Sequence, residues 1–145
     1  MKIHRIDHVG INVNDLPAAT AFFLELGFEV SAEWVVEGAW AGRIIGLDDV
    51  KSDVVMLQTP DGGGKIELST FHAPTDANGI QHFLANAHGI RHICLTIEDI
   101  EALVARLEKH GAQLIGEIQN YENIYKVCYL RAPEGIILEL AEEIH

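Results

Sequence analysis

Two histidines and two glutamates stand at corresponding places in the two halves of the chain, and together they have the composition of a metal site. His8 and His92 lie near the start of two similar apolar segments, and Glu67 and Glu139 lie in two later ones. Neutral imidazoles and ionised carboxylates suit a borderline divalent cation such as Zn, Ni, Co, Fe or Mn. The paired carboxylates balance the charge of such an ion, and an octahedral ion keeps two positions open for water or for two neighbouring substrate oxygens. We therefore expect these four residues to hold one divalent metal ion.

An internal repeat, in which the second half follows the first at an offset of 84 positions, predicts the elements that position these residues. Each copy begins with a segment of alternating apolar residues, typical of a strand, and continues with an amphipathic helical stretch. Asp15 and Asp99 stand where an N-cap carboxylate accepts unpaired backbone N–H groups. Gly27 and Gly111 stand where a left-handed residue ends each helix. The predicted strand and helix pairs are 7–15 with 16–26, and 91–99 with 100–110.

A hairpin rich in β-branched residues, with Pro and Gly at its turn, follows in each half. The predicted hairpins are 53–58 with 65–69 and 126–130 with 136–140; further strands are expected near 28–36 and 113–118, and a short helix in the extra segment 39–47. Each half then has the order β-α-β-β-β. We expect one domain over 1–145, made of modules at about 1–71 and 91–145, with a linker at 72–90 that has a helical turn at 80–87.

The alternation of side chains along a strand predicts which residues share a surface. The apolar sets of the four key strands pack on the helices, so His8, Glu67, His92 and Glu139 project from the opposite face. Cys94 lies on that face too, where a small buried thiol is its commoner use. The aromatic residues are either ordinary core residues or the walls of a pocket: Trp34, Trp40, Tyr121, Tyr125 and Tyr129.

The charge of the chain limits its partners. The chain has 10 Lys and Arg residues and 22 Asp and Glu residues, so its net charge is −12. The sequence shows no basic patch that could hold a nucleic acid backbone. No apolar stretch reaches the ~18 residues of a membrane span. Two cysteines and a polar start predict a soluble protein of a reducing cytoplasm. We expect a small-molecule substrate, with neither nucleic acid nor membrane as partner.

The chain resembles the vicinal oxygen chelate superfamily, which includes glyoxalase I, methylmalonyl-CoA epimerase, extradiol dioxygenases and the fosfomycin and bleomycin resistance proteins. The matching segments are IDHVGINV at 6–13, KIEL at 65–68, IRHI at 90–93 and APEGIILEL at 132–140. The resemblance implies an α+β fold in which two tandem βαβββ modules form a curved, incomplete β-barrel around a central cavity. It also implies a homodimer, and it places His8, Glu67, His92 and Glu139 at the superfamily's metal-ligand positions. The carboxylate at Glu67 resembles glyoxalase I, because the epimerase commonly has Gln there.

The leading functional hypothesis is a metal-dependent lyase or isomerase that chelates vicinal oxygens of a small carbonyl compound and stabilises an enediolate. In glyoxalase I a glutamate ligand acts as the base, so the resemblance points to Glu139, or by symmetry Glu67, as the catalytic residue. Glu37 and Glu122 are candidate bases outside the ligand set. The alternatives are a non-haem Fe(II) extradiol-type dioxygenase, a metal-free drug- or metabolite-binding resistance protein, and fosfomycin-type thiol transfer.

Overall fold

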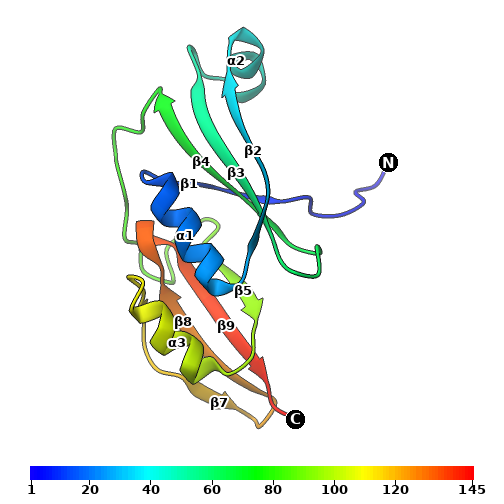
Figure 1. Ribbon diagram of the computed structural model, residues 1–145, viewed down its shortest axis with the longest axis vertical. Helices are drawn as coiled ribbons and strands as arrows, with labels where there is room; N and C mark the ends of the chain where they lie inside the picture. The colour runs from blue at the N-terminus through cyan, green and yellow to red at the C-terminus, as the bar shows by residue number, and fades with distance from the viewer. The chain divides into compact units, whose positions relative to one another are not determined.

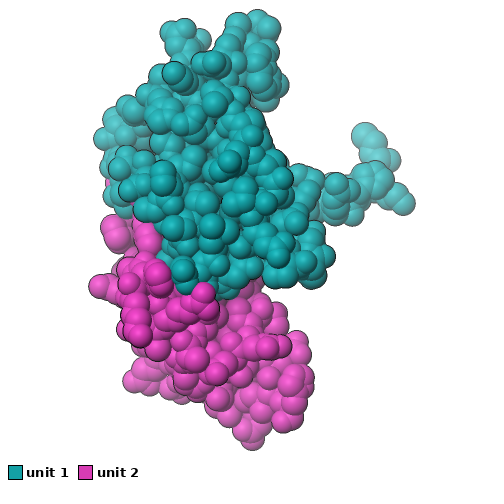
Figure 2. All heavy atoms as spheres, viewed as in Figure 1, with its two compact units in different colours: residues 1–80 teal, residues 81–145 magenta.

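The computed structural model describes residues 1–145 and divides into two compact units, Met1–Ile80 and Gln81–His145 (Figures 1 and 2). Each unit has its own mixed sheet, and neither sheet closes into a barrel. Three α-helices accompany the two sheets, which confirms the predicted α+β class. None of these helices has the length and apolar character needed to cross a lipid bilayer.

Unit 1 is a four-stranded sheet covered on one face by a helix. Its elements are β1 (Val9–Asn12), α1 (Leu16–Leu26), β2 (Glu29–Glu37), α2 (Ala39–Ile45), β3 (Lys51–Gln58) and β4 (Lys65–Ala73). The strand order is β1-β4-β3-β2, with β1 parallel to β4 and the other pairs antiparallel. Helix α1 packs on β3 and β4 through Phe22 and Phe23, and the buried strand residues include Leu57 and Leu68. The short helix predicted in the extra segment is present as α2.

Unit 2 repeats this plan with one more strand. Its elements are β5 (His92–Thr96), α3 (Ile100–Glu108), β6 (Gln113–Leu114), β7 (Gln119–Tyr121), β8 (Tyr125–Arg131), a 3-10 turn (Pro133–Gly135) and β9 (Ile137–Glu143). The order is β5-β9-β8-β6, which matches the order in unit 1, and β7 also pairs with β8. Leu138 and Leu140 of β9 are fully buried, as the alternation of the sequence predicts.

Helices α1 and α3 start as the repeat predicts. The Asp15 carboxylate accepts the N–H of Ala18 at 3.1 Å, and the Asp99 carboxylate accepts the N–H of Ala102 at 3.2 Å. Each bond satisfies one of the backbone donors that the first helical turn leaves without an intrahelical partner. The N-cap prediction is confirmed in both units.

Helices α1 and α3 also end in the same way. Gly27 and Gly111 have φ values of 118° and 95°, in the left-handed region that glycine adopts at low cost. After each glycine, the next amide donates to the carbonyl five residues earlier, at 3.0 Å and 3.1 Å, which is the Schellman pattern. Helix α3 ends at Glu108, two residues before the predicted end, because the chain tightens into a turn before Gly111.

Two local predictions are wrong. The strand expected at 113–118 is a strand only at Gln113–Leu114 (β6), because Gly116, at φ 131°, bends the chain; β7 begins later, at Gln119. The stretch 80–87 has no helical turn; it has one tight turn, closed by the N–H of Ala87 on the carbonyl of Leu84 at 3.0 Å. In this stretch the carbonyl of Phe83 accepts a hydrogen bond from the side chain of Arg131, and the carbonyl of Ala87 accepts one from Arg91.

Candidate functional site

The first candidate pair lies in unit 1, where the parallel strands β1 and β4 bring His8 beside Glu67. Gly10 of β1 is in register with Glu67, and His8 lies two residues earlier on the same face. The Nε2 atom of His8 is 3.4 Å from Oε2 of Glu67. Both side chains are partly exposed, at 35% and 27%, so a ligand can reach the two atoms. The strand register therefore forms a two-donor cluster from residues 59 positions apart.

Asp7 orients the imidazole of this pair. Its Oδ2 atom lies 2.8 Å from Nδ1 of His8. The hydrogen bond with His8, and then the charge of Lys65, lower the pKa of the Asp7 carboxyl, so Asp7 is an ionised acceptor at neutral pH. With Nδ1–H donated to Asp7, the lone pair of Nε2 faces Glu67, which is the arrangement that carboxylates impose on metal-binding histidines. The sequence analysis did not assign Asp7 a role, although its position next to His8 was a signal.

The second pair lies in unit 2 and is built in the same way. Cys94 of β5 is in register with Glu139 of β9, and His92 lies two residues before Cys94. The Nε2 atom of His92 is 3.1 Å from Oε2 of Glu139, with the side chains 35% and 24% exposed. The Tyr129 hydroxyl lies 3.5 Å from Nδ1 of His92, and the two rings are 4.9 Å apart. Tyr129 thus takes the place beside the imidazole that Asp7 has in unit 1.

The surroundings of the second pair keep its neighbours protonated. Burial raises the pKa of Tyr129, and the charge of Glu139 raises it further. Burial likewise raises the pKa of Cys94, whose thiol also donates a hydrogen bond to Glu139. The Cys94 thiol donates to Glu139, and the neutral Tyr129 hydroxyl can accept from Nδ1–H of His92, so neither group competes as an anion for a cation. These properties do not support a nucleophilic role for Cys94.

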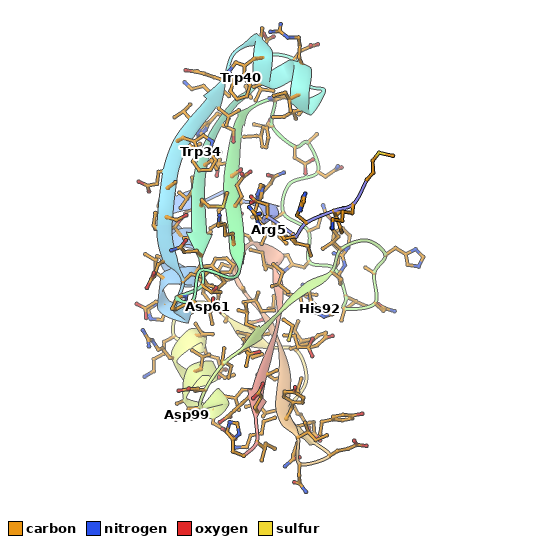
Figure 3. All side chains as sticks on the ribbon, turned by 90° about the vertical axis from the view of Figure 1, so that its right-hand side faces the viewer. Arg5, Trp34, Trp40, Asp61, His92 and Asp99 are labelled. Carbon is orange, nitrogen blue, oxygen red and sulfur yellow. The ribbon has the colours of Figure 1, made fainter.

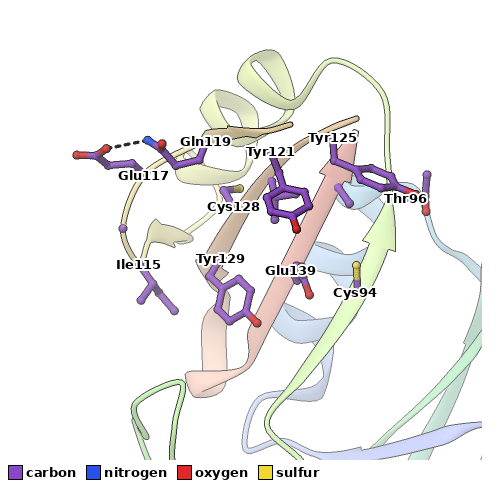
Figure 4. A pocket seen from close by; sticks show the side chains of 13 residues that line it. Cys94, Thr96, Ile115, Glu117, Gln119, Tyr121, Tyr125, Cys128, Tyr129 and Glu139 are labelled. Carbon is purple, nitrogen blue, oxygen red and sulfur yellow. Dashed lines mark hydrogen bonds between the residues drawn. The ribbon is translucent and has the colours of Figure 1, made fainter. Parts of the chain in front are cut away.

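Glu139 opens onto a cavity of about 690 Å³ within unit 2 (Figure 4). The lining residues include Glu139, Cys94, Glu117, Tyr121, Tyr125 and Tyr129. The tyrosines of the second half are thus pocket walls, one of the two interpretations that the sequence left open. In the first half, Trp34 and Trp40 project from β2 and α2 to the surface, with 39% and 54% of their area exposed (Figure 3).

The positions of Glu37 and Glu122 do not support a role for either residue as the catalytic base. Glu37 lies at the exposed end of β2, and Glu122 lies in the exposed turn between β7 and β8. Neither residue lines the cavity beside Glu139. This leaves the glutamates of the two pairs as the candidates for proton transfer.

The repeated sheet units and their His–Glu pairs can now be compared with known proteins. The family model described as the glyoxalase/bleomycin resistance protein/dioxygenase superfamily matches residues 5–140. The chain belongs to this superfamily. The crystal structure of a glyoxalase family protein from Bacillus cereus superposes with a TM-score of 0.96 and 43% identity, covering 100% of this chain and 97% of that one.

Among other members of the superfamily, an ethylmalonyl-CoA/methylmalonyl-CoA epimerase from Cereibacter sphaeroides is 35% identical over 117 residues, which are 79% of this chain and 76% of the relative. The uncharacterized protein YaeR of Escherichia coli is 26% identical over 144 residues, 99% of each chain. The glyoxalase I of Leishmania major shares the fold, with a TM-score of 0.66 and 22% identity over 97% of this chain and 88% of that one. Membership and the epimerase relative support an isomerase or epimerase type of function.

The donor atoms of the two pairs fit the divalent metal that members of the superfamily typically use. Two ligands about 2.1 Å from one ion are separated by about 3.0 Å at a right angle and about 3.4 Å at a tetrahedral angle. The observed nitrogen–oxygen distances of 3.1 Å and 3.4 Å agree with this spacing. No cluster of three or more His, Cys, Asp or Glu side chains has the geometry of a metal site. Each unit therefore supplies two donors at the spacing of neighbouring metal ligands.

Proposed function

We propose that this protein is a metal-dependent isomerase or lyase that moves a proton at the carbon beside a substrate carbonyl. Its metal ligands in this proposal are His8, Glu67, His92 and Glu139. The observation that carries it is the presence of two equivalent His–Glu pairs, each with its donor atoms at the spacing of neighbouring ligands. The epimerase relative supports the same kind of chemistry. When bound, the ion would act as a Lewis acid on two adjacent substrate oxygens.

Glu139 is the proposed base. Its carboxylate is partly exposed to the cavity, so the C–H group of a substrate can reach it. In the proton-transfer step the C–H bond breaks, the proton goes to a carboxylate oxygen of Glu139, and the electron pair moves onto the substrate carbonyl oxygen. The thiol of Cys94 donates a hydrogen bond that holds the carboxylate in place. Return of the proton to the same or to a neighbouring carbon completes an epimerisation or an isomerisation.

Glu67 is the symmetric alternative for this base. It has the same relation to His8 that Glu139 has to His92. The surroundings of the two glutamates differ, because Glu139 lines the cavity of unit 2 and contacts a thiol. We therefore assign proton transfer to Glu139 and metal binding alone to Glu67.

The exchange of a substrate C–H for deuterium in D₂O tests this function. Hydroxyacetone and its phenyl analogue, phenacyl alcohol, are suitable probes, followed by NMR with protein loaded in turn with Ni, Co, Zn, Mn or Fe(II). The wild-type protein should catalyse exchange with at least one ion. The Glu139→Gln variant should lose at least ~100-fold in rate, the usual contribution of a positioned base, and should bind the metal more weakly. Glu108→Gln, an exposed carboxylate on α3 of the same unit and outside the cavity, is the matched control and should leave both unchanged.

The outcomes separate the possible functions. Full exchange activity in Glu139→Gln would remove the assignment of the base. Oxygen uptake with a catechol and Fe(II), without C–H exchange, would favour a dioxygenase. Failure of every ion to bind would contradict the metal-dependent reaction and favour a protein that only sequesters its ligand.

We also propose that the protein acts as a homodimer, in which the two pairs of one site come either from one copy or from both. Mixing two inactive variants tests this. One variant carries His8→Ala and Glu67→Ala, and the other carries His92→Ala and Glu139→Ala. After the subunits have exchanged, a mixed dimer with shared sites has one intact site and recovers part of the activity. If both pairs of a site belong to one chain, the mixture stays inactive.

A further inference from the structure

The face of unit 2 that carries Glu139 also carries a cluster of tyrosines. Tyr129 of β8 is in register with Glu139, and Tyr125 lies four residues earlier on the same strand and therefore on the same face. Tyr121 of β7 stands directly opposite Tyr125. Figure 4 shows the three rings arranged around the space beside Glu139. The register of β7, β8 and β9 thus forms an aromatic wall next to the proposed reacting group.

The equivalent face of unit 1 carries no tyrosine; its aromatic residues are Trp34 of β2, opposite Val54, and Phe71 of β4, opposite Ser52. There Met56 of β3 is in register with Glu67, as Tyr129 is with Glu139. Four residues before Met56 stands Ser52, at the place of Tyr125. The sheet of unit 1 has four strands and that of unit 2 has five, with β7 as the addition. The His–Glu pairs are common to both units, whereas the tyrosine wall belongs to unit 2 alone.

The rings of the wall are available for contact. Tyr121 is 61% exposed and Tyr125 is 36% exposed, although both border a cavity. Ile115 and Val127 extend the same lining with apolar groups. Aromatic rings stack best on another flat ring, either offset or edge to face, and an apolar lining excludes water from that contact.

The charge of the lining excludes one class of substrate. Glu117 and Glu139 are its charged members, and it contains neither Lys nor Arg. The two basic residues of β8 are engaged elsewhere. Lys126 pairs with Glu101 at 3.0 Å, and Arg131 donates to backbone carbonyls at 3.2 Å and 2.7 Å. With a net charge of −12 on the whole chain, a phosphorylated or otherwise anionic substrate body would be repelled from this cavity.

We infer that the cavity of unit 2 selects substrates whose body is a flat, uncharged aromatic group and discriminates against those with an anionic body. This inference rests on the proposed function, because it places the carbonyl end of the substrate at Glu139. The aromatic body then stacks on Tyr121 and Tyr125. The two tyrosines are specificity-determining residues that take no part in the proton transfer.

Three probes with the same hydroxyketone group test the selectivity. Phenacyl alcohol carries a phenyl ring, hydroxyacetone a methyl group, and dihydroxyacetone phosphate a phosphate. Their affinities for the protein as purified can be measured by ligand-observed NMR, without any need for turnover. We expect phenacyl alcohol to bind about tenfold more tightly than hydroxyacetone, the effect of one good aromatic contact. The phosphate should bind more weakly than hydroxyacetone.

Matched variants assign the preference to the wall. Replacing Tyr121 and Tyr125 together by Leu keeps apolar bulk but removes the rings, and it should abolish the preference for phenacyl alcohol. Trp40→Leu removes an exposed aromatic ring from α2 of unit 1, which does not line the cavity, and should leave the preference unchanged. Circular dichroism of each variant confirms that it is folded.

The results distinguish this inference from the proposed function. Equal affinity for the phenyl and methyl probes, tighter binding of the phosphate, or an unchanged preference in the double variant would each overturn the inference. Aromatic preference in binding without C–H exchange would support the inference and contradict the proposed reaction. Exchange of the substrate C–H without a preference for the phenyl probe would support the proposed reaction and contradict this inference.

Discussion

Replacing Asp7 gives the sharpest test of the metal-site geometry, because the substitution should lower the metal affinity and leave the protein folded. Its carboxylate accepts a hydrogen bond from Nδ1 of His8 at 2.8 Å and so leaves Nε2 free to bind an ion. Loss of such a carboxylate typically weakens metal affinity 10- to 100-fold. Asp7 is exposed, and water can partly replace it as an acceptor, so we expect Asp7→Ala to lie near the lower end, at about tenfold.

The chain contains a matched control for this experiment. Asp53 lies 2.8 Å from Nε2 of His72, also in unit 1, and both side chains are about half exposed. Asp53→Ala removes the same charge from the same unit but does not touch the proposed ligands. Calorimetric titration with Ni²⁺ should therefore show weaker binding in Asp7→Ala only, and thermal unfolding should show both variants folded. Equal loss of Ni²⁺ affinity in both variants would indicate a general effect of removing a negative charge. Unchanged Ni²⁺ affinity in Asp7→Ala would refute the role of Asp7 in orienting His8.

Two further predictions concern the stability and the reactivity of the chain. A Cβ atom at Gly135 would collide with the carbonyl oxygen of Gln81, whereas Gly62, with nearly the same φ (73° against 76°), has open space. Gly62→Ala should cost about 1 kcal/mol of unfolding free energy for the backbone conformation, and Gly135→Ala clearly more, as measured by urea denaturation; equal costs would contradict the collision. Cys128 is buried, which raises its pKa to about 11, so iodoacetamide at pH 8 should modify Cys94 slowly and Cys128 only after unfolding, as followed by mass spectrometry. Modification of Cys128 in the folded protein would show that unit 2 opens.

The sequence by itself determined the features that depend on neighbouring residues. The caps of α1 and α3 follow from Asp15 and Asp99, because a short acidic side chain reaches the amide three residues later whatever the rest of the chain does. The helix ends follow from Gly27 and Gly111 for an equally local reason, the left-handed φ. The early end of the strand expected at 113–118 was missed, because Gly116, a single residue with a positive φ, overrides the strand pattern beside it.

The candidate site shows which features follow from the sequence and which need the tertiary structure. Alternation along each strand was enough to place a His and a Glu of each unit on the face away from the helix. Only the parallel register of β1 with β4, and of β5 with β9, brought the donor atoms to 3.4 Å and 3.1 Å. The tertiary structure likewise decided that Tyr121 faces Tyr125 beside Glu139, because this depends on how β7 pairs with β8. Strand pairing joins residues far apart in the chain, and a pattern of neighbours carries no information about it.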